Sequence, residues 1–253
     1  MKHPKSILIT GASSGIGAAL AAEYAAPGVH LSLTGRNLAR LEDVERLCTD
    51  KGAECETHIL DVTDQSAMAA LIRDIDQRQP LDLVIANAGV SGGSGGNGET
   101  EAQARSIFDV NFGGVINTIW PAIDAMKPRQ RGQVAIVSSI AGMTPLPGAP
   151  AYSASKAAVK AYAEALNGAL RQDGIVVSAI CPGFVESRIT AQNNFPMPLF
   201  MDAPKAAKRI RKGLEKGQIS IIFPRRLAAI TWLIGLLPPR LRVWLLSHAP
   251  KKG

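Results

Sequence analysis

Tyr152 and Lys156 lie four residues apart, and Tyr152 follows Ser139 by thirteen residues. Four residues make about one helical turn, so on a helix the phenol and the ammonium project from one face and can meet. A free phenol has a pKa of ~10, and a fixed cation beside it favours the phenolate and lowers that pKa. The pair is therefore a candidate acid/base couple. The same spacing is common on solvated helix faces, so the surrounding elements must show whether this pair is catalytic or an ordinary surface pair.

Short β-branched runs alternate with helix-length segments along the whole chain. Runs such as Val134–Val137 are continuously apolar, which is typical of parallel strands covered on both faces. Repeated strand–helix alternation predicts an α/β fold, a doubly wound seven-stranded parallel sheet (a Rossmann fold) with helices on both faces. The expected strands are Ser6–Thr10, His30–Thr34, Glu56–Leu60, Leu81–Ala86, Gln133–Ser138, Ile175–Cys181 and Ile219–Phe223. The expected helices are Ile16–Ala25, Leu38–Lys51, Gln65–Gln77, Glu101–Met126, Ala151–Gln172 and Pro204–Lys216.

The size and composition of the chain suit one large domain spanning residues 1–253. Hydrophobic residues make up 46% of the 253 residues and charged residues 19%, which is typical of a globular protein. The three cysteines are too few for a disulfide framework, and no metal-binding spacing is present, so no metal site is expected. No secretory signal and no apolar run of ~20 residues is visible, so we expect a cytoplasmic protein.

The segment Thr10–Gly17 follows the first expected strand and opens the first expected helix. In this loop Gly11 suits a tight turn, Gly15 allows close approach of a ligand, and Gly17 allows close helix–strand packing. Phosphate groups would rest at the helix N-terminus, on the backbone of Ser13, Ser14 and Ile16. The spacing is G-x-x-x-G-x-G, a variant of the dinucleotide-binding fingerprint, and it predicts a nucleotide site.

The ends of the next three strands supply further candidate contacts to a nucleotide. Arg36 stands where an acidic residue would bind the ribose of NAD, and its guanidinium matches a 2′-phosphate instead. We therefore expect NADP(H) to be preferred, with NAD(H) still able to bind and Asn37 able to contact either. Asp61 and Val62 are placed to contact adenine, and Asn87-Ala88-Gly89 puts small residues where a cofactor lies close.

The assembled pattern resembles the short-chain dehydrogenase/reductase family. The matching elements are Thr10–Gly17, Asn87-Ala88-Gly89, Asn111, Ser138-Ser139, Tyr152-Ser153-Ala154-Ser155-Lys156 and Pro182-Gly183, which occur in family order over about three quarters of the chain. The resemblance implies that Tyr152 exchanges the proton, Lys156 lowers the phenol pKa and holds the nicotinamide ribose, and Ser139 binds the substrate oxygen. It also implies that Asn111 organises a water relay through Lys156; without the resemblance, a locally bonded helix amide would be preferred.

The resemblance implies further contacts after the sixth strand and a reaction class. Pro182, Gly183 and Val185 would contact the nicotinamide, and Ser187, where the family usually has threonine, would reach a phosphate. Ser138 competes with Ser139 for the catalytic role, and the thirteen-residue interval to Tyr152 favours Ser139. The implied activity is NADP(H)-preferring interconversion of a carbonyl and a secondary alcohol on a small, lipophilic molecule. Family members are often homodimers or homotetramers, and this is expected here.

The C-terminal fifth of the chain is distinctive. From residue 204 to residue 253 the sequence has twelve Lys/Arg and one acid, whereas the remainder has sixteen bases and twenty acids. Residues 192–216, with an apolar, proline-containing start at 192–204, are a candidate substrate lid. The basic, apolar tail, residues 225–253, fits an oligomer contact, a wall of the substrate pocket or a peripheral membrane contact through 225–246.

The basic, apolar tail is also compatible with two function classes other than an enzyme. A nucleotide-bound regulatory or scaffolding protein that docks through its tail would not require Asn111, Ser139, Tyr152 and Lys156 together. A nucleic-acid-binding module would rest on the tail charge alone and lacks alternating aromatic residues, so no nucleic-acid partner is expected.

Overall fold

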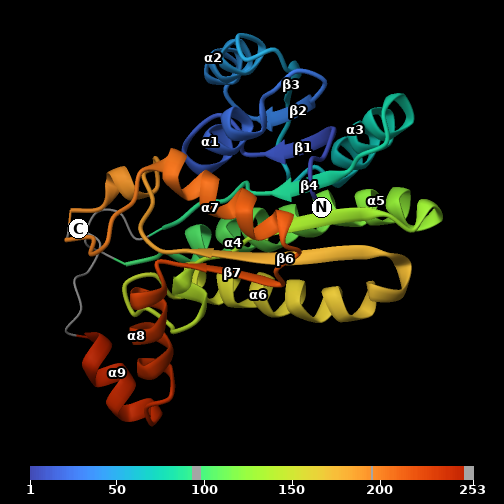
Figure 1. The fold of residues 1–253 in the computed structure, drawn as a ribbon. Helices are drawn as coiled ribbons and strands as arrows, with labels where there is room; N and C mark the ends of the chain where they lie inside the picture. The colour runs from blue at the N-terminus through green and yellow to red at the C-terminus, as the bar shows by residue number, and fades with distance from the viewer. Residues whose placement is uncertain (93–97, 195, 248–253) are drawn as a thin grey trace.

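Seven parallel strands form one sheet in the order β3-β2-β1-β4-β5-β6-β7 in the computed structural model (Figure 1), which describes residues 1–92, 98–194 and 196–247. The strands are β1 Ser6–Thr10, β2 His30–Gly35, β3 Glu54–Ile59, β4 Leu83–Ala86, β5 Gly132–Val137, β6 Ile175–Pro182 and β7 Ser220–Phe223. Strands are added to one side of β1 as far as β3, and then from β4 onward to the other side. The point between β1 and β4 where this order switches is where open α/β sheets bind ligands. The predicted doubly wound fold is confirmed.

Helices cover both faces of this sheet. They are α1 Gly15–Tyr24, α2 Leu38–Thr49, α3 Gln65–Arg78, α4 Glu101–Phe108, α5 Gly114–Met126, α6 Pro150–Ala169, α7 Ala203–Glu215, α8 Arg225–Gly235 and α9 Pro239–Ser247. Side chains alternate along a strand, so Ile7 and Ile9 of β1 pack with α1, α2 and α7, while Leu8 packs with α3, α5 and α6. Two apolar cores separated by the sheet follow from this alternation.

The helix predicted over Glu101–Met126 is wrong as a single element. The structure has α4, then a π-helical turn at Asp109–Gly113, then α5. A π turn inserts one extra residue into the helical repeat and changes which side chains face inward. Here it turns Asn111 into the protein, where its side chain is fully buried.

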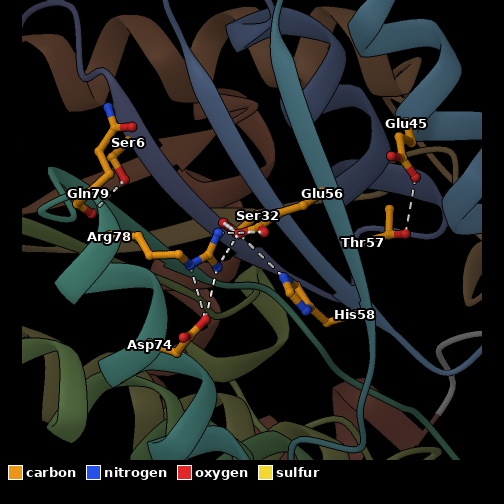
Figure 2. Close-up of polar contacts among 9 residues, drawn as sticks. All are labelled: Ser6, Ser32, Glu45, Glu56, Thr57, His58, Asp74, Arg78 and Gln79. Carbon is orange, nitrogen blue, oxygen red and sulfur yellow. Dashed lines mark hydrogen bonds and ion pairs between the residues drawn. The ribbon is translucent and has the colours of Figure 1, made fainter.

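The outer strand β3 is held to the sheet by a polar cluster (Figure 2). Arg78 of α3 lies between two carboxylates, with Nη1 3.0 Å from Glu56 Oε2 and Nη2 3.0 Å from Asp74 Oδ2. Ser32 of β2 donates a hydrogen bond to the same Glu56 at 2.7 Å. Burial alone would raise the pKa of Glu56, but these hydrogen bonds and the nearby His58 outweigh it and hold that pKa below its ordinary value. The cluster therefore stays ionised and ties β3 to α3.

The C-terminal half changes two expectations. Residues 203–215 form α7, which packs its buried Ala207 and Ile210 against α1, so only the connecting segment 193–202 stays a candidate lid. The tail forms α8 and α9, and Figure 1 shows both helices projecting below the end of the sheet. None of the described helices is long and apolar enough to cross a bilayer. Residues 93–97, residue 195 of the candidate lid and residues 248–253 of the tail lie outside the described residues.

Candidate active site

A cavity of about 380 Å³ opens at the carboxyl ends of the strands. Most residues predicted from the sequence line it: Gly11, Ser13, Ser14, Gly15, Ile16, Arg36, Asp61, Val62, Asn87, Ala88, Gly89, Ser139, Tyr152, Lys156, Pro182, Gly183, Val185 and Ser187. Parallel strands bring all of their carboxyl ends to one edge, which explains why residues so distant in sequence meet here. Gly17, Asn37 and Asn111 do not line the cavity.

The glycine loop after β1 is built for close backbone contact. Gly11 has a φ of +65°, and a Cβ on it would lie 2.7 Å from Ala88 Cα. A Cβ on Gly17 would lie 2.4 Å from the carbonyl oxygen of Gly11, so a larger residue has no room. The Asn87 amide donates hydrogen bonds to the carbonyl oxygens of Thr10 and Gly11 at 2.9 and 3.1 Å. Asn87 therefore fixes the loop in addition to lining the cavity.

The N-terminus of α1 opens into the cavity. Ser14 occupies the N-cap position without a capping side-chain hydrogen bond, and the first turn contains no acid. The first N–H groups of a helix lack partners within it and carry the positive end of the dipole. These donors suit a pyrophosphate, so the site fits the phosphate portion of a dinucleotide.

Two arginines line the cavity around the start of α2, after the end of β2. Arg36 Nη1 lies 3.5 Å from Asp61 Oδ2, and the Arg36 side chain is 67% exposed. Arg40 also lines the cavity, and its Nε is buried without a hydrogen-bond partner. Sequence reasoning missed Arg40, although its i, i+4 spacing from Arg36 was an available signal. Asn37 instead accepts a hydrogen bond from the Arg40 N–H at 3.0 Å and caps α2.

Asp61 keeps its charge beside Arg36. The N–H of Thr63 is the main cause that holds the pKa of Asp61 below its ordinary value, and the nearby guanidinium of Arg36 adds to it. A carboxylate and two guanidinium groups thus share the end of the cavity at the tips of β2 and β3. The guanidinium groups can bind a phosphate there, and the carboxylate can bind a hydroxyl or an adenine amine.

Tyr152 and Lys156 of α6 and Ser139, which follows β5, line the part of the cavity that we call the catalytic corner. Lys156 Nζ lies 5.8 Å from the centroid of the Tyr152 ring, as the helical spacing predicted. Ser139 lines the same cavity, and its hydroxyl lowers the pKa of the nearby Tyr152 phenol. The two hydroxyl groups can therefore hold one substrate oxygen between them.

The electrostatics of this corner differ from the expectation. Lys156 is only 4% exposed, and burial lowers its pKa to about 8. Its Nζ donates a hydrogen bond to the Val137 carbonyl oxygen at 2.9 Å. Burial raises the pKa of Tyr152, and the Ser139 hydroxyl offsets only part of this rise. The expected lowering of the phenol pKa by Lys156 is not seen here, because burial acts against the charged forms of both side chains.

Ser138 and Ser139 have different surroundings. Ser138 Oγ donates a hydrogen bond to the Lys156 carbonyl oxygen at 2.6 Å, which fixes β5 against α6. Ser139 Oγ accepts from the Ala141 N–H at 3.1 Å and reaches Tyr152. The geometry therefore supports Ser139 as the residue that faces a substrate and Ser138 as a support for Lys156.

Comparison with known proteins agrees with this arrangement. The sequence description of the short chain dehydrogenase family matches residues 5–197. The chain belongs to the short-chain dehydrogenase family. An uncharacterised oxidoreductase of Myxococcus xanthus is 40% identical over 235 residues, which are 92% of this chain and 93% of that protein.

Solved structures of the family superpose over nearly the whole dehydrogenase. A short-chain dehydrogenase from Sphingobium yanoikuyae in complex with NADPH has a TM-score of 0.80 and 26% identity, covering 98% of this chain and 97% of that one. A 3-oxoacyl-[acyl-carrier protein] reductase from Brucella melitensis with bound NAD has a TM-score of 0.74 and 27% identity, covering 85% and 87%. The chain is therefore an oxidoreductase with a nicotinamide cofactor.

Asn111 of this dehydrogenase is committed to protein hydrogen bonds. Its Oδ1 accepts from the Val90 N–H at 2.8 Å, and its Nδ2 donates to the Val90 carbonyl oxygen and to Ser155 Oγ, both at 3.0 Å. A Cβ on Gly89 would lie 3.2 Å from Asn111 Oδ1 and 3.3 Å from Lys156 Nζ, so Gly89 keeps the two side chains close. The bonds to Val90 and Ser155 join the loop after β4, the π turn and α6. The water relay stays a prediction.

The segment after β6 closes the cavity. The Gly183 N–H donates to the Phe223 carbonyl oxygen at 2.8 Å, and Val185 forms a bridge with Met201. Ser187 shares hydrogen bonds with Thr190, including a 2.9 Å bond from the Ser187 N–H to Thr190 Oγ1. Thr190 lines the cavity as well, so a threonine hydroxyl is present beside the serine that stands at the family's usual threonine position.

Glu99 does not line the cavity but supports the helix that carries Tyr152, a contact that the sequence did not reveal. Its carboxylate accepts hydrogen bonds from the N–H groups of Ala151 and Tyr152, the latter at 3.2 Å, and so caps the N-terminus of α6. No local pattern signals this contact, because Glu99 lies fifty-three positions before Tyr152. The cap fixes the first turn of the helix that carries the phenol.

We expect Glu99→Ala to lower the free energy of unfolding by about 1 kcal/mol, because two N–H groups and the positive helix end lose their partner. Turnover should fall several-fold through kcat, with cofactor binding unchanged. Thermal unfolding and steady-state kinetics check both. Glu101→Ala is the matched control, since Glu101 is exposed and, among the described residues, pairs with Arg105 alone. Equal effects from the two variants would remove the positioning role.

Proposed function

We propose that this dehydrogenase is an NADP(H)-preferring oxidoreductase that interconverts a carbonyl and a secondary alcohol. The observation that carries the proposal is that Ser139, Tyr152 and Lys156 line the same cavity as the open N-terminus of α1, with Lys156 Nζ 5.8 Å from the Tyr152 ring centroid. The bound nicotinamide would supply or accept the hydride. The backbone at the start of α1 would hold the phosphates of a dinucleotide, with Arg36 and Tyr152 among the other residues that line the same cavity.

The chain's own residues divide the remaining work. Ser139 and Tyr152 would hold the substrate oxygen, which limits its orientation relative to the nicotinamide. In reduction Tyr152 would give its proton to the developing alkoxide, and in oxidation it would take the proton back. A phenol whose pKa is raised by burial is protonated at neutral pH, which suits the donor role. Lys156, with its pKa lowered to about 8, would supply positive charge near the phenolate once the proton has left.

The preference for NADP(H) is supported by the two arginines at the start of α2. Arg36 and Arg40 line the end of the cavity where the adenosine ribose would lie, and the Arg40 Nε has no partner within the described chain. Relatives of similar fold have been solved with NADPH and with NAD, so the fold alone accepts either. The proposed preference for NADP(H) over NAD(H) therefore depends on Arg36 and Arg40.

A lipophilic substrate is supported by the apolar character of the segments around the cavity. Val90 and Ile189 line the cavity, and the candidate lid segment 193–202 exposes Leu199 and Phe200 beside the Val185–Met201 bridge. The Brucella relative is a 3-oxoacyl-[acyl-carrier protein] reductase, and because a 3-oxoacyl group carries a ketone, this supports a ketone substrate here. The homodimer or homotetramer and the cytoplasmic location stay predictions from the sequence.

Turnover of a ketone panel with NADPH tests the function. We expect aliphatic and aromatic ketones to be reduced with kcat/KM values that rise with apolar size, and polar hydroxyketones of similar size to be poor substrates. NADPH oxidation at 340 nm in the presence of each ketone is the measurement. Tight NADPH binding without turnover of any carbonyl would favour the alternative, a nucleotide-bound regulatory or scaffolding protein.

A further inference from the structure

Helices α8 and α9 expose an unusual amount of apolar surface. Eight of the sixteen exposed large hydrophobic side chains of the described chain lie here, and each is 41–64% exposed. They are Ile230, Trp232, Leu233, Leu236, Leu241, Val243, Trp244 and Leu245, and we call them the tail patch. Only Ala228 is buried in α8, and no residue of α9 is. Figure 1 shows the two helices standing away from the body of the protein.

Packing on the opposite side fixes the orientation of the tail patch. The Thr231 carbonyl oxygen accepts a 2.7 Å hydrogen bond from Thr144 Oγ1, and Leu227 lies against Gly183, where an added Cβ would be 3.1 Å from Leu227 Cδ2. These contacts, with buried Ala228, form one helical face. Ile230 and Leu233 occupy the other face, which points away from the domain.

Cations surround the tail patch without acidic partners. From residue 216 to residue 253 the sequence has seven Lys/Arg and no Asp/Glu. Arg225 and Arg226 begin α8, and Arg240 and Arg242 lie in the first turns of α9. In the part of the chain that the structure describes, no ion pair involves these four arginines, although Arg242 donates to the Gly235 carbonyl oxygen at 3.0 Å.

We propose that the tail patch docks on an anionic lipid surface. In a two-fold dimer through this face, the same patch of each copy would meet, so arginines would face arginines with no carboxylate between them. Lipid phosphates supply the missing negative charge. Tryptophans and flanking arginines around aliphatic residues suit the interface between headgroups and acyl chains. Helices of eleven and nine residues lie in that interface rather than crossing the bilayer.

The docked orientation has a consequence that rests on the proposed function. Helix α8 contacts the short helical turn Ile140–Gly142, which directly follows Ser139, and it touches Gly183 on the cavity wall. The bilayer would therefore lie beside the catalytic end of the cavity. A ketone dissolved in the membrane would reach Ser139 and Tyr152 without crossing bulk water.

Vesicle co-sedimentation of the full chain, without cofactor or substrate, tests the docking. We expect the protein to bind vesicles of equal parts phosphatidylcholine and phosphatidylglycerol at least ~10-fold more tightly than vesicles of phosphatidylcholine alone. Arg225→Gln and Arg226→Gln should each weaken binding about fivefold. Leu233→Gln should weaken it about tenfold. Arg73→Gln and Leu47→Gln, exposed positions on α3 and α2, are the matched controls and should bind as the wild type does.

Several results would overturn docking on lipid. One is wild-type protein that stays in the supernatant with both kinds of vesicle. Another is tail variants that sediment as well as the wild type. A third is a wild-type dimer that does not bind vesicles and that Leu233→Gln converts to a monomer. That result would show that the tail patch contacts a second copy of this chain rather than lipid. Tyr152→Phe should bind vesicles as the wild type does, so failure of the docking is distinguishable from failure of the proposed chemistry.

Discussion

Replacing Tyr152 by phenylalanine should reduce ketone turnover by ~10²–10⁴-fold, because the variant keeps the ring and loses the proton donor. The phenol lies at the wall of the cavity together with Ser139, and no other tyrosine of the described chain lines that cavity. The cofactor-binding groups at α1 and α2 are untouched, so the Kd of NADPH should stay within about twofold of the wild-type value. Single-turnover reduction and NADPH fluorescence titration measure the two quantities separately.

Tyr162→Phe on the same helix is the matched control. The Tyr162 hydroxyl accepts a 2.9 Å hydrogen bond from Trp120 Nε1 and lies outside the cavity. It should cost some stability, on the order of 1 kcal/mol for the lost hydrogen bond, and leave turnover unchanged. If Tyr152→Phe reduced ketones as fast as the wild type, proton transfer would have to come from another group and the proposed mechanism would be wrong.

The contrast between Tyr152 and Glu99 shows how far the sequence predicts the site. Tyr152 and Lys156 are neighbours on one helix, and Ser139 lies just after the preceding strand β5, so local spacing and the parallel sheet determine that they meet. Glu99 reaches the same helix from a loop before α4, through two hydrogen bonds that no periodicity encodes. Spacing predicts contacts along one element, whereas contacts between distant loops require coordinates.

The π turn and the pKa values illustrate two further limits. The segment around Asn111 contains the adjacent glycines Gly113 and Gly114, which weaken a helix, but such residues do not say whether the chain breaks, stays α-helical or forms a π turn. The charges of Tyr152 and Lys156 are set by how deeply each is buried, which the sequence does not state. The chemistry of the side chains was therefore predictable, but their protonation equilibria were not.

Arg36→Ala should weaken NADPH binding by ~10–100-fold, which corresponds to the loss of a charge-assisted hydrogen bond to a phosphate. NADH binding should change by less than about twofold, because NADH has a hydroxyl at the same position. The loss for NADPH has a second cause. Asp61 lies 3.5 Å from Arg36, and removing the guanidinium leaves this carboxylate facing the 2′-phosphate. The variant should therefore shift its preference towards NADH.

Arg40→Ala tests the contribution of the second arginine to NADPH binding. Its Nε is buried and without a partner, so a bound phosphate would satisfy it, and the variant should also lose NADPH selectively. Because Arg36 and Arg40 would bind one phosphate, the double variant should lose less than the product of the two single losses. Arg46→Ala, an exposed α2 arginine that pairs with Asp43, is the control and should leave both cofactors unaffected. Equal losses of NADPH and NADH in Arg36→Ala would show that the guanidinium does not bind the 2′-phosphate, and the preference for NADP(H) would have no basis in this end of the cavity.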